Sequence, residues 1–400
     1  MQFPADFLWG TATSAYQTEG YNTNSDWWYW EKGKYPKSKR KAFIGETSGM
    51  ACDSYNRYEE DFNFAKNMNN NAIRFSIEWA RIEPRKGEWD QTEVEHYKKV
   101  IKAAKERGLK TFVTLHHFTK PIWFSKLGGW LNPFAPKWFA NYAKKCAEEY
   151  SDYIDFFITL NEPQVYSLQA YWRATWTPKI KCKLFALISQ LTQIKAHKKA
   201  YTAIKFVDNS AKVGLSKHIV RYERVTNDRG KASICTKLVC KVLHYLTTNF
   251  FLDPIKKHLD FIGLNYYFTA WMKNFKEKNP EMESSDLGWI LYPEGLKHIL
   301  LNLKKYNLPI YITEHGLADA WDQKRQWYIN ESLKFVYEAM ESGVDVRGYL
   351  HWSLIDNFEW HIGFWPKFGL IEIDREHNLT RKPRPSFYMY SQICRTGKVE

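Results

Sequence analysis

The sequence predicts an α/β protein, and within that class a single (β/α)8 TIM barrel spanning residues 1–400. Short apolar runs, each followed by a longer amphipathic stretch, recur along the chain, which is typical of repeated βα units around a parallel sheet. Eight such runs can be counted. No linker, low-complexity tract or repeat divides the chain, and barrels of this length commonly form one unit.

The predicted elements follow each other in strand–helix order. We expect strands at 7–11, 71–77, 110–115, 154–160, 212–216, 261–265, 309–313 and 347–352. We expect helices at 54–69, 93–107, 136–150, 184–206 and 324–341. Gly108 and Gly343 follow two of these helices, at positions where a residue in the left-handed backbone conformation is expected to end the helix. The stretch 217–259 is basic and ambiguous in period, so it is hard to divide.

Composition places the chain among ordinary globular proteins, with 44% hydrophobic and 26% charged residues. The longest apolar runs are strand-sized, so we expect no transmembrane segment. The first residues show neither a basic region nor an apolar signal core, which favours a cytoplasmic location. Six scattered cysteines without a C-x-x-C pair give no reason to expect a metal site.

A net charge of +14 favours non-specific attraction to anionic surfaces such as nucleic acid or acidic lipids. Basic residues cluster at 32–41 and 179–183, in loop-like surroundings. No nucleic-acid fold signature accompanies them, so we expect solvated basic loops and no specific nucleic-acid partner. A nucleic-acid or membrane-surface function would rest on charge alone, and the salt dependence of binding would test it.

Two glutamates follow predicted strands at positions where a barrel assembles its active site. Glu162 comes directly after the fourth strand and Glu314 directly after the seventh. The carboxyl ends of barrel strands meet at one opening, so both side chains should face it from opposite sides. Paired carboxylates are what glycoside hydrolysis requires, one as acid and one as the group that attacks the anomeric carbon. We therefore predict a catalytic pair.

Other strand ends carry residues suited to binding a sugar. Hydroxyl groups need a dense set of donors and acceptors, and the apolar faces of a pyranose lie on Trp or Tyr rings. The candidates are Gln17, His117, Asn265, Tyr267, Trp352, Glu359 and Trp360.

Several ordered motifs resemble glycoside hydrolase family 1, the β-glucosidase and β-galactosidase family, along almost the whole chain. They are FPADFLWG at 3–10, YQTEG at 16–20, RFSIEW at 74–79, LHHF at 115–118, NEP at 161–163, NYY at 265–267, TEHG at 313–316 and WSLIDNFEW at 352–360. An isolated NEP is weak evidence, but this order and spacing are highly specific. The resemblance implies a retaining β-glycosidase that needs no cofactor and takes a small β-glycoside or oligosaccharide.

Carried over residue by residue, the resemblance implies that Glu162 is the acid/base and Glu314 the nucleophile. Arg74 and Tyr267 would hold Glu314, the first by lowering its pKa through opposite charge. Asn161 would bond the sugar 2-hydroxyl, and Trp289 resembles the aromatic residue of the aglycone site. The resemblance also implies that Gln17, His117, Glu359 and Trp360 grip the ring hydroxyls and that Trp352 is the stacking floor.

The chain departs from the family pattern at three places. Phe118 stands where Trp is usual and His315 where Asn is usual. The region between 163 and 260 is shortened, and residues 164–178 replace the usual loop after the acid, which should open or reshape the aglycone entrance. These departures leave open the preferred sugar, the natural aglycone, transglycosylation and the oligomeric state.

Two alternatives to a β-glucosidase or β-galactosidase remain. A 6-phospho-β-glycosidase would show a Ser, Lys and Tyr phosphate-binding set after the eighth strand, where this chain has Glu359, Pro366 and Phe368. An anionic Glu359 would repel a phosphate, so we expect Phe368 to line a site for an unphosphorylated sugar. A non-catalytic sugar-binding barrel would be favoured if either carboxylate were replaced, and neither is.

Overall fold

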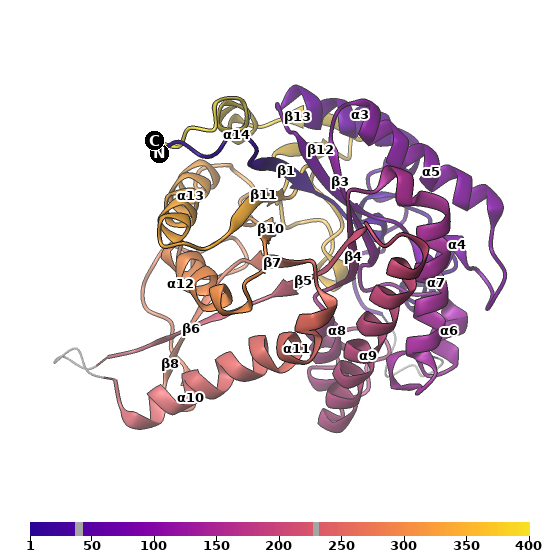
Figure 1. Ribbon diagram of the computed structural model, residues 1–400, viewed down its shortest axis with the longest axis horizontal. Coiled ribbons are helices and arrows are strands. Elements are labelled where there is room, and N and C mark those ends of the chain that lie inside the picture. Colours follow the sequence, from indigo (N-terminus) through magenta and orange to yellow (C-terminus); the bar gives the residue numbers. More distant parts are fainter. Residues whose placement is uncertain (37–42, 227–231) are drawn as a thin grey trace.

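Eight parallel strands close into a barrel at the centre of the computed structural model, which describes residues 1–36, 43–226 and 232–400 (Figure 1). The part of the basic cluster at 37–41 lies outside these residues. The neighbour order is β1-β11-β10-β7-β5-β4-β3-β2. The strands are β1 (Leu8–Ala12), β2 (Ala72–Ser76), β3 (Lys110–His116), β4 (Phe156–Asn161), β5 (Lys212–His218), β7 (Phe261–Tyr266), β10 (Ile310–His315) and β11 (Val346–Trp352). All eight predicted strands are confirmed, with ends that shift by one or two residues.

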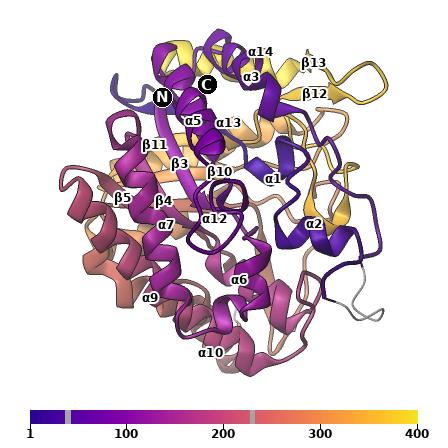
Figure 2. The same cartoon turned by 90° about the vertical axis from the view of Figure 1, so that its right-hand side faces the viewer.

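Helices form the outer ring of the barrel, as Figures 1 and 2 show. The five predicted helices are confirmed as α3 (Ser54–Asn67), α5 (Gln91–Glu106), α7 (Ala135–Tyr150), α9 (Lys183–Val207) and α13 (Arg325–Glu341). The sequence analysis did not predict α12 (Glu294–Leu303) and α14 (Pro385–Thr396). Shorter helices are α1 (Ala15–Thr18), α2 (Asp26–Glu31), α4 (Trp79–Ile82), α6 (Ile122–Lys126), α8 (Pro163–Ser167) and α11 (Phe250–Leu252).

Helix α5 illustrates how the sequence specifies this outer layer. The Asp90 carboxylate accepts hydrogen bonds from the backbone N–H groups of Thr92 and Glu93, which caps the helix start. Apolar residues of α5 recur every three or four positions and are buried against the barrel. After the helix, Gly108 has a φ of +75°, as expected for its stop, and Gly343 has a φ of +79° after α13.

The interior of the barrel is layered, with an apolar floor beneath a polar level. Phe112, Phe156, Phe261 and Tyr311 pack together, and the Phe112 and Phe156 rings stack with centroids 4.1 Å apart. Two residues further along a strand, side chains point to the same side again. The residues two positions beyond Phe112 and Tyr311 are Thr114 and Thr313, so part of the floor supports a hydrogen-bonded polar layer at the carboxyl ends of the strands. That layer includes Arg74, Thr114 and Thr313.

The stretch 217–259, which the sequence left undivided, forms part of a small outlying unit. It contains β6 (Arg221–Arg224), α10 (Ile234–His244) and the π-helical turn η5 (Tyr245–Asn249). Strand β6 joins β8 (Thr269–Lys273) and β9 (Lys276–Glu277) in a three-stranded sheet. Only Thr236 and Cys240 of α10 are buried, so its apolar residues do not mark a core-facing side. The hydrophobic periodicity of α10 therefore does not point to the core, whereas Phe251, Leu252 and Ile255 later in the stretch are buried.

The chain ends beside its beginning, after a hairpin of β12 (Ile371–Asp374) and β13 (Thr380–Pro383). The amino group of Met1 donates to the Val399 carbonyl at 2.8 Å, and Figure 1 shows the two termini together. Within the described ranges, no helix has both the length and the hydrophobicity of a membrane span.

Candidate active site

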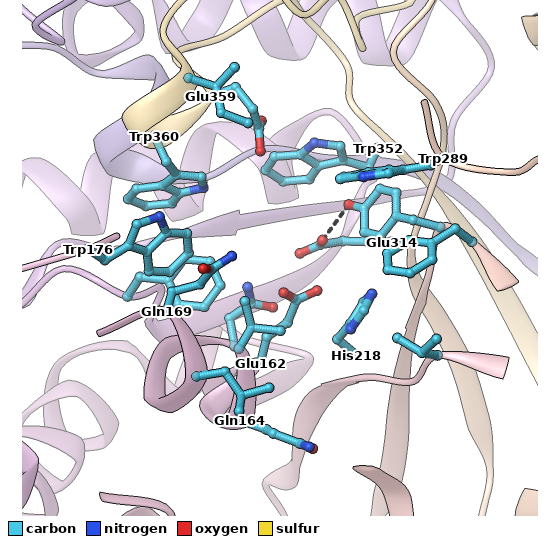
Figure 3. A pocket seen from close by; sticks show the side chains of 18 of the residues that line it. Glu162, Gln164, Gln169, Trp176, His218, Trp289, Glu314, Trp352, Glu359 and Trp360 are labelled. Atoms are coloured by element: carbon cyan, nitrogen blue, oxygen red, sulfur yellow. Dashed lines mark hydrogen bonds between the residues drawn. The ribbon is translucent and has the colours of Figure 1, made fainter. Parts of the chain in front are cut away.

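Glu162 and Glu314 lie at the carboxyl ends of β4 and β10, inside a cavity of about 310 Å³. Figure 3 shows their carboxylates pointing toward one another across this cavity. Both side chains are buried. The barrel therefore brings together the two carboxylates that the sequence predicted as a pair.

Glu314 is held by one cation and one hydroxyl group. Arg74 Nη1 lies 2.6 Å from one carboxylate oxygen, and the Tyr267 hydroxyl donates to the other at 2.6 Å. Burial raises the pKa of Glu314 above its ordinary value, while Arg74 and then Tyr267 oppose that rise. The lowering effect expected of Arg74 is present, but the effect of burial is larger.

Glu162 has a different environment, although it is the same type of side chain. Asn265 Nδ2 donates to its carboxylate at 2.7 Å. Burial, followed by the negative charge of Glu314, raises the pKa of Glu162 to about 8. Because the guanidinium touches Glu314 and not Glu162, the proton shared by this coupled pair is held by Glu162.

Asn161 connects the two carboxylates. Its side-chain oxygen accepts from Arg74 at 2.7 Å and from Asn265 at 3.1 Å, so each of its donors also contacts one of the glutamates. Its amide nitrogen lies 3.0 Å from His117 Nε2. Burial holds the pKa of His117 well below its ordinary value, so the ring is neutral. We assign the ring proton to Nδ1, because the amide donates to Nε2.

A third carboxylate, Glu359, is partly buried and faces the pair from the opposite wall, as Figure 3 shows. Glu359 accepts a hydrogen bond from Gln17 at 3.2 Å, and Gln17 also donates to Asn357 at 2.9 Å. Burial, with a contribution from the charge of Glu314, raises the pKa of Glu359 to about 8. This rise favours the protonated form of Glu359 and weakens the expectation of an anionic side chain at this position.

Aromatic rings form most of the remaining wall. The His117 ring is stacked with Trp352 at 5.9 Å and with Trp360 at 6.1 Å between centroids. Trp289 packs against the apolar cluster that contains Trp352, and its ring meets Tyr267 at 5.7 Å and Phe368 at 6.2 Å between centroids. The cavity thus offers apolar ring faces beside a concentrated set of polar groups, the mixture that sugars require.

The structure brings all the predicted site residues to one place. Arg74 and Asn265 hold the carboxylates by hydrogen bonds from behind the wall. The predicted residues that line the cavity are Gln17, His117, Asn161, Glu162, Tyr267, Trp289, Glu314, Trp352, Glu359, Trp360 and Phe368.

The departures from the family pattern lie in the wall and behind it. Phe118 lines the cavity and meets the Trp360 and Trp176 rings edge-on at 5.1 and 4.9 Å. His315 packs behind the wall, where its Nδ1 lies 2.8 Å from the Tyr349 hydroxyl and burial lowers its pKa to about 3. The replacement segment 164–178 forms α8 and the π-helical turn η4 (Leu168–Trp172). It supplies several wall residues, including Gln169 and Trp176.

Sequence reasoning missed two neighbouring residues that end β5. Lys217 is buried, and its Nζ donates to the Gln164 side chain at 2.7 Å and to the His218 carbonyl at 2.8 Å. Burial lowers the pKa of Lys217 to about 7, although the charge of Glu162 opposes this. His218 lines the cavity. A signal was available, because both residues follow directly after the predicted strand 212–216.

The other missed wall residues come from segments without a regular pattern. Trp176 lies in an irregular stretch, and its indole N–H donates to His361 at 2.9 Å. The outlying sheet and η5 contribute Tyr222, Thr247, Ala270 and Glu277. Nothing in the sequence pattern predicts that these segments fold over the barrel opening.

Three non-glycine wall residues have left-handed backbone conformations. The φ values are +43° at Glu162, +72° at Phe118 and +54° at Trp360. Such conformations cost on the order of 1 kcal/mol each and persist where the surroundings impose them. Their concentration around this cavity agrees with a functional site.

A closed (β/α)8 barrel with two facing carboxylates in an aromatic cavity defines a glycoside hydrolase of the paired-carboxylate class. Comparisons with known proteins agree. The Pyrococcus woesei β-galactosidase is 30% identical over 489 residues, covering 96% of this chain and 94% of that protein. A β-glycosidase structure from Pyrococcus horikoshii is 34% identical, with a TM-score of 0.91 and coverage of 100% and 96%.

A Thermotoga maritima β-glucosidase in complex with glucoimidazole is 28% identical, with a TM-score of 0.91 and full coverage of both chains. The model of glycosyl hydrolase family 1 matches residues 1–237 and 247–399. The chain belongs to glycosyl hydrolase family 1 and is a β-glucosidase-like glycoside hydrolase. The family resemblance of the sequence motifs is thereby confirmed.

Proposed function

We propose that the protein hydrolyses terminal non-reducing β-D-glycosides of the glucoside or galactoside type by double displacement, in one catalytic domain spanning residues 1–400. The observation that carries this proposal is the unequal environment of two facing carboxylates. Glu314 forms an ion pair with Arg74, whereas Glu162 accepts a hydrogen bond from the neutral amide of Asn265. One group is therefore suited to be ionised while the other holds a proton.

In the first step, the Glu314 carboxylate attacks the anomeric carbon as the bond to the leaving oxygen breaks. The Glu162 carboxylic acid gives its proton to that oxygen, so the aglycone departs as a neutral alcohol. The product is a glycosyl ester on Glu314. The raised pKa of Glu162 supports this role, because an ordinary glutamate would hold no proton at neutral pH.

In the second step, Glu162 is a carboxylate and takes a proton from water as that water attacks the anomeric carbon. The ester bond to Glu314 breaks, and the sugar leaves with retained configuration. Retaining enzymes place the two carboxyl groups about 5 to 5.5 Å apart. The short hydrogen-bonded path through Arg74, Asn161 and Asn265 supports such close placement. Neither step requires a metal or an organic cofactor.

The non-reducing sugar would lie on Trp352 with its hydroxyls toward Gln17, His117, Glu359 and Trp360. Among the residues that the structure describes, His117 Nδ1 has no hydrogen-bond partner, so it is free to donate to a hydroxyl. The Asn161 amide would bond the 2-hydroxyl, and Trp289 and Phe368 would flank the substrate. A protonated Glu359 can donate as well as accept.

The test is a mechanism-based 2-fluoro β-glucoside followed by mass spectrometry of the labelled peptide. We expect a covalent label on Glu314 and none on the Glu314→Gln variant, which should also lose turnover. A label on another residue contradicts the assignment. Release of the α-anomer, followed by proton NMR during early turnover, contradicts the retaining mechanism.

The 6-phospho-β-glycosidase alternative has less support than a glycosidase for neutral sugars. The raised pKa of Glu359 weakens the expected repulsion of a phosphate, but Pro366 and Phe368 still stand where the phosphate ligands are expected. A sugar-binding barrel without catalysis has no supporting observation, because both carboxylates are present and differently held. The cytoplasmic location and the absence of a specific nucleic-acid partner stay predictions.

A further inference from the structure

Helix α10 turns its apolar side away from the protein. Ile234 is 84% exposed and Leu238 60% exposed, and Val242 and Tyr245 are about half exposed at 47% and 53%. These residues are three or four positions apart, so they share one side of the helix. A surface helix ordinarily turns that side to the core. The opposite side of α10 packs on β6 and β8.

A second exposed ring extends this apolar side. Phe275, in the turn between β8 and β9, is 80% exposed. The turn is fixed beside the helix start, because the Asn274 backbone N–H donates to Thr236 Oγ1 at 2.9 Å and Ser233 donates to the Asn274 side chain at 2.8 Å. We name the set Ile234, Leu238, Val242, Tyr245 and Phe275 the α10 surface. Figure 1 shows α10 at the lower edge of the molecule.

Lysines border the α10 surface. Lys237 and Lys241 are exposed one position before Leu238 and Val242, and Lys273 and Lys276 are exposed on either side of the Phe275 turn. Glu277 is the neighbouring acidic residue, and it also lines the active-site cavity. Apolar side chains bordered by lysines are the pattern of a helix that lies in the plane of a membrane interface.

We propose that the α10 surface docks on the face of a phospholipid bilayer that carries anionic lipids. The apolar side chains would enter the boundary between headgroups and acyl chains, and the four lysines would meet anionic headgroups. Charge complementarity selects this partner over a second copy of the chain. Two such surfaces placed face to face would bring their lysines together, and each chain carries a net charge of +14.

Docking would place the bilayer beside the entrance of the active-site cavity. The turn η5 continues α10, and its Thr247 lines that cavity. Gln164, next to the proposed acid/base, donates to the Leu246 carbonyl at 3.4 Å. This step rests on the proposed function. If that function holds, the natural substrates include β-glycosides whose aglycone is a lipid chain anchored in the bilayer.

Binding is tested by cosedimentation of the full chain with sucrose-loaded vesicles of phosphatidylcholine alone or mixed with phosphatidylglycerol. We expect binding to the anionic vesicles that weakens as salt rises. The double variant Lys237→Gln/Lys241→Gln should reduce the partition coefficient by about 30-fold, from the usual contribution of a lysine at an anionic surface. Leu238→Glu/Val242→Glu should reduce it by more than about tenfold.

Matched control variants change similar residues elsewhere. Lys66→Gln/Lys99→Gln removes two exposed charges on α3 and α5, which Figure 1 places away from α10. Phe206→Glu changes a side chain at the end of α9 that is 81% exposed. Both should bind vesicles within about twofold of the wild type. Equal binding to both vesicle types, or equal losses in test and control variants, would overturn the proposal. The proposal would also be overturned if sedimentation velocity detected a dimer of the wild type and the Leu238→Glu/Val242→Glu variant were a monomer.

The substrate step has its own readout. Hydrolysis of a dodecyl β-glucoside embedded in the anionic vesicles should fall at least tenfold in the α10 variants, while hydrolysis of dissolved p-nitrophenyl β-glucoside stays at the wild-type rate. Equal effects on the two substrates would overturn the lipid-aglycone step. If the wild type cleaved neither, the proposed function would fail, and vesicle binding alone would decide the docking surface.

Discussion

Replacing Tyr267 by Phe should separate the ionisation of the nucleophile from that of the acid. The Tyr267 hydroxyl donates to Glu314 at 2.6 Å in a buried site, so solvent does not screen the contact. A hydrogen bond to a charged group contributes about 1.5–3 kcal/mol. This bond favours the carboxylate, so its loss raises the pKa of Glu314. Attack requires the ionised form of Glu314, so when the pH is lowered the variant should lose activity at a higher pH than the wild type does.

The assay is the pH profile of kcat/KM on an aryl β-glucoside. On the acid side of the profile, kcat/KM of the variant should be about 10- to 150-fold below that of the wild type. This ratio is the free energy of the lost hydrogen bond converted to a rate ratio. The alkaline limb should move less. The matched control is Tyr266→Phe, because that hydroxyl donates to the Tyr292 carbonyl at 2.6 Å and contacts neither glutamate. The reasoning is refuted if the acid limb stays in place, or if Tyr266→Phe moves it equally.

Three further outcomes test the other groups of the site. Glu162→Ala should slow the hydrolysis of glycosides with poor leaving groups most. Azide should restore the rate on activated aryl glycosides by forming a β-glycosyl azide. Equal losses on aryl and alkyl glycosides would require another acid. Lys217→Met should move the alkaline limb of the kcat/KM profile to higher pH, because the ammonium charge of Lys217 lowers the pKa of Glu162. A shift to lower pH would contradict this. Unphosphorylated β-glucosides should give higher kcat/KM than their 6-phospho forms, since Phe368 lines the cavity where a phosphate would need cations, and the opposite preference would exclude our assignment.

The barrel and the facing pair of carboxylates could be predicted from sequence because both depend on short-range patterns. A buried strand such as β4 is a run of apolar residues, and the polar residue that ends it must lie at the barrel opening. That rule alone places Glu162 and Glu314. It also covers Lys217 and His218, which follow directly after the predicted fifth strand but were missed.

The rest of the site depends on contacts that no local pattern encodes. Trp176 reaches the wall through an irregular segment, and Thr247 through a π-helical turn that follows a helix with an exposed apolar side. The pKa of Glu359 is a further example. The family resemblance placed Glu359 and Gln17 at one sugar site, but the rise in the pKa of Glu359 depends on burial and on the charge of Glu314, which the sequence does not show.

The difference between the two glutamates originates in β2, a strand that carries neither of them. Arg74 points into the barrel, where one nitrogen contacts Glu314 and another contacts Asn161, the residue before Glu162. A shift of β2 by one residue would turn this side chain to the other face and leave the two buried carboxyl groups without the guanidinium that distinguishes them. Such a pair would share a proton with no fixed assignment of acid and nucleophile. The motifs around the glutamates therefore supply two candidates of equal chemistry, and the register of Arg74 favours Glu314 as the proposed nucleophile.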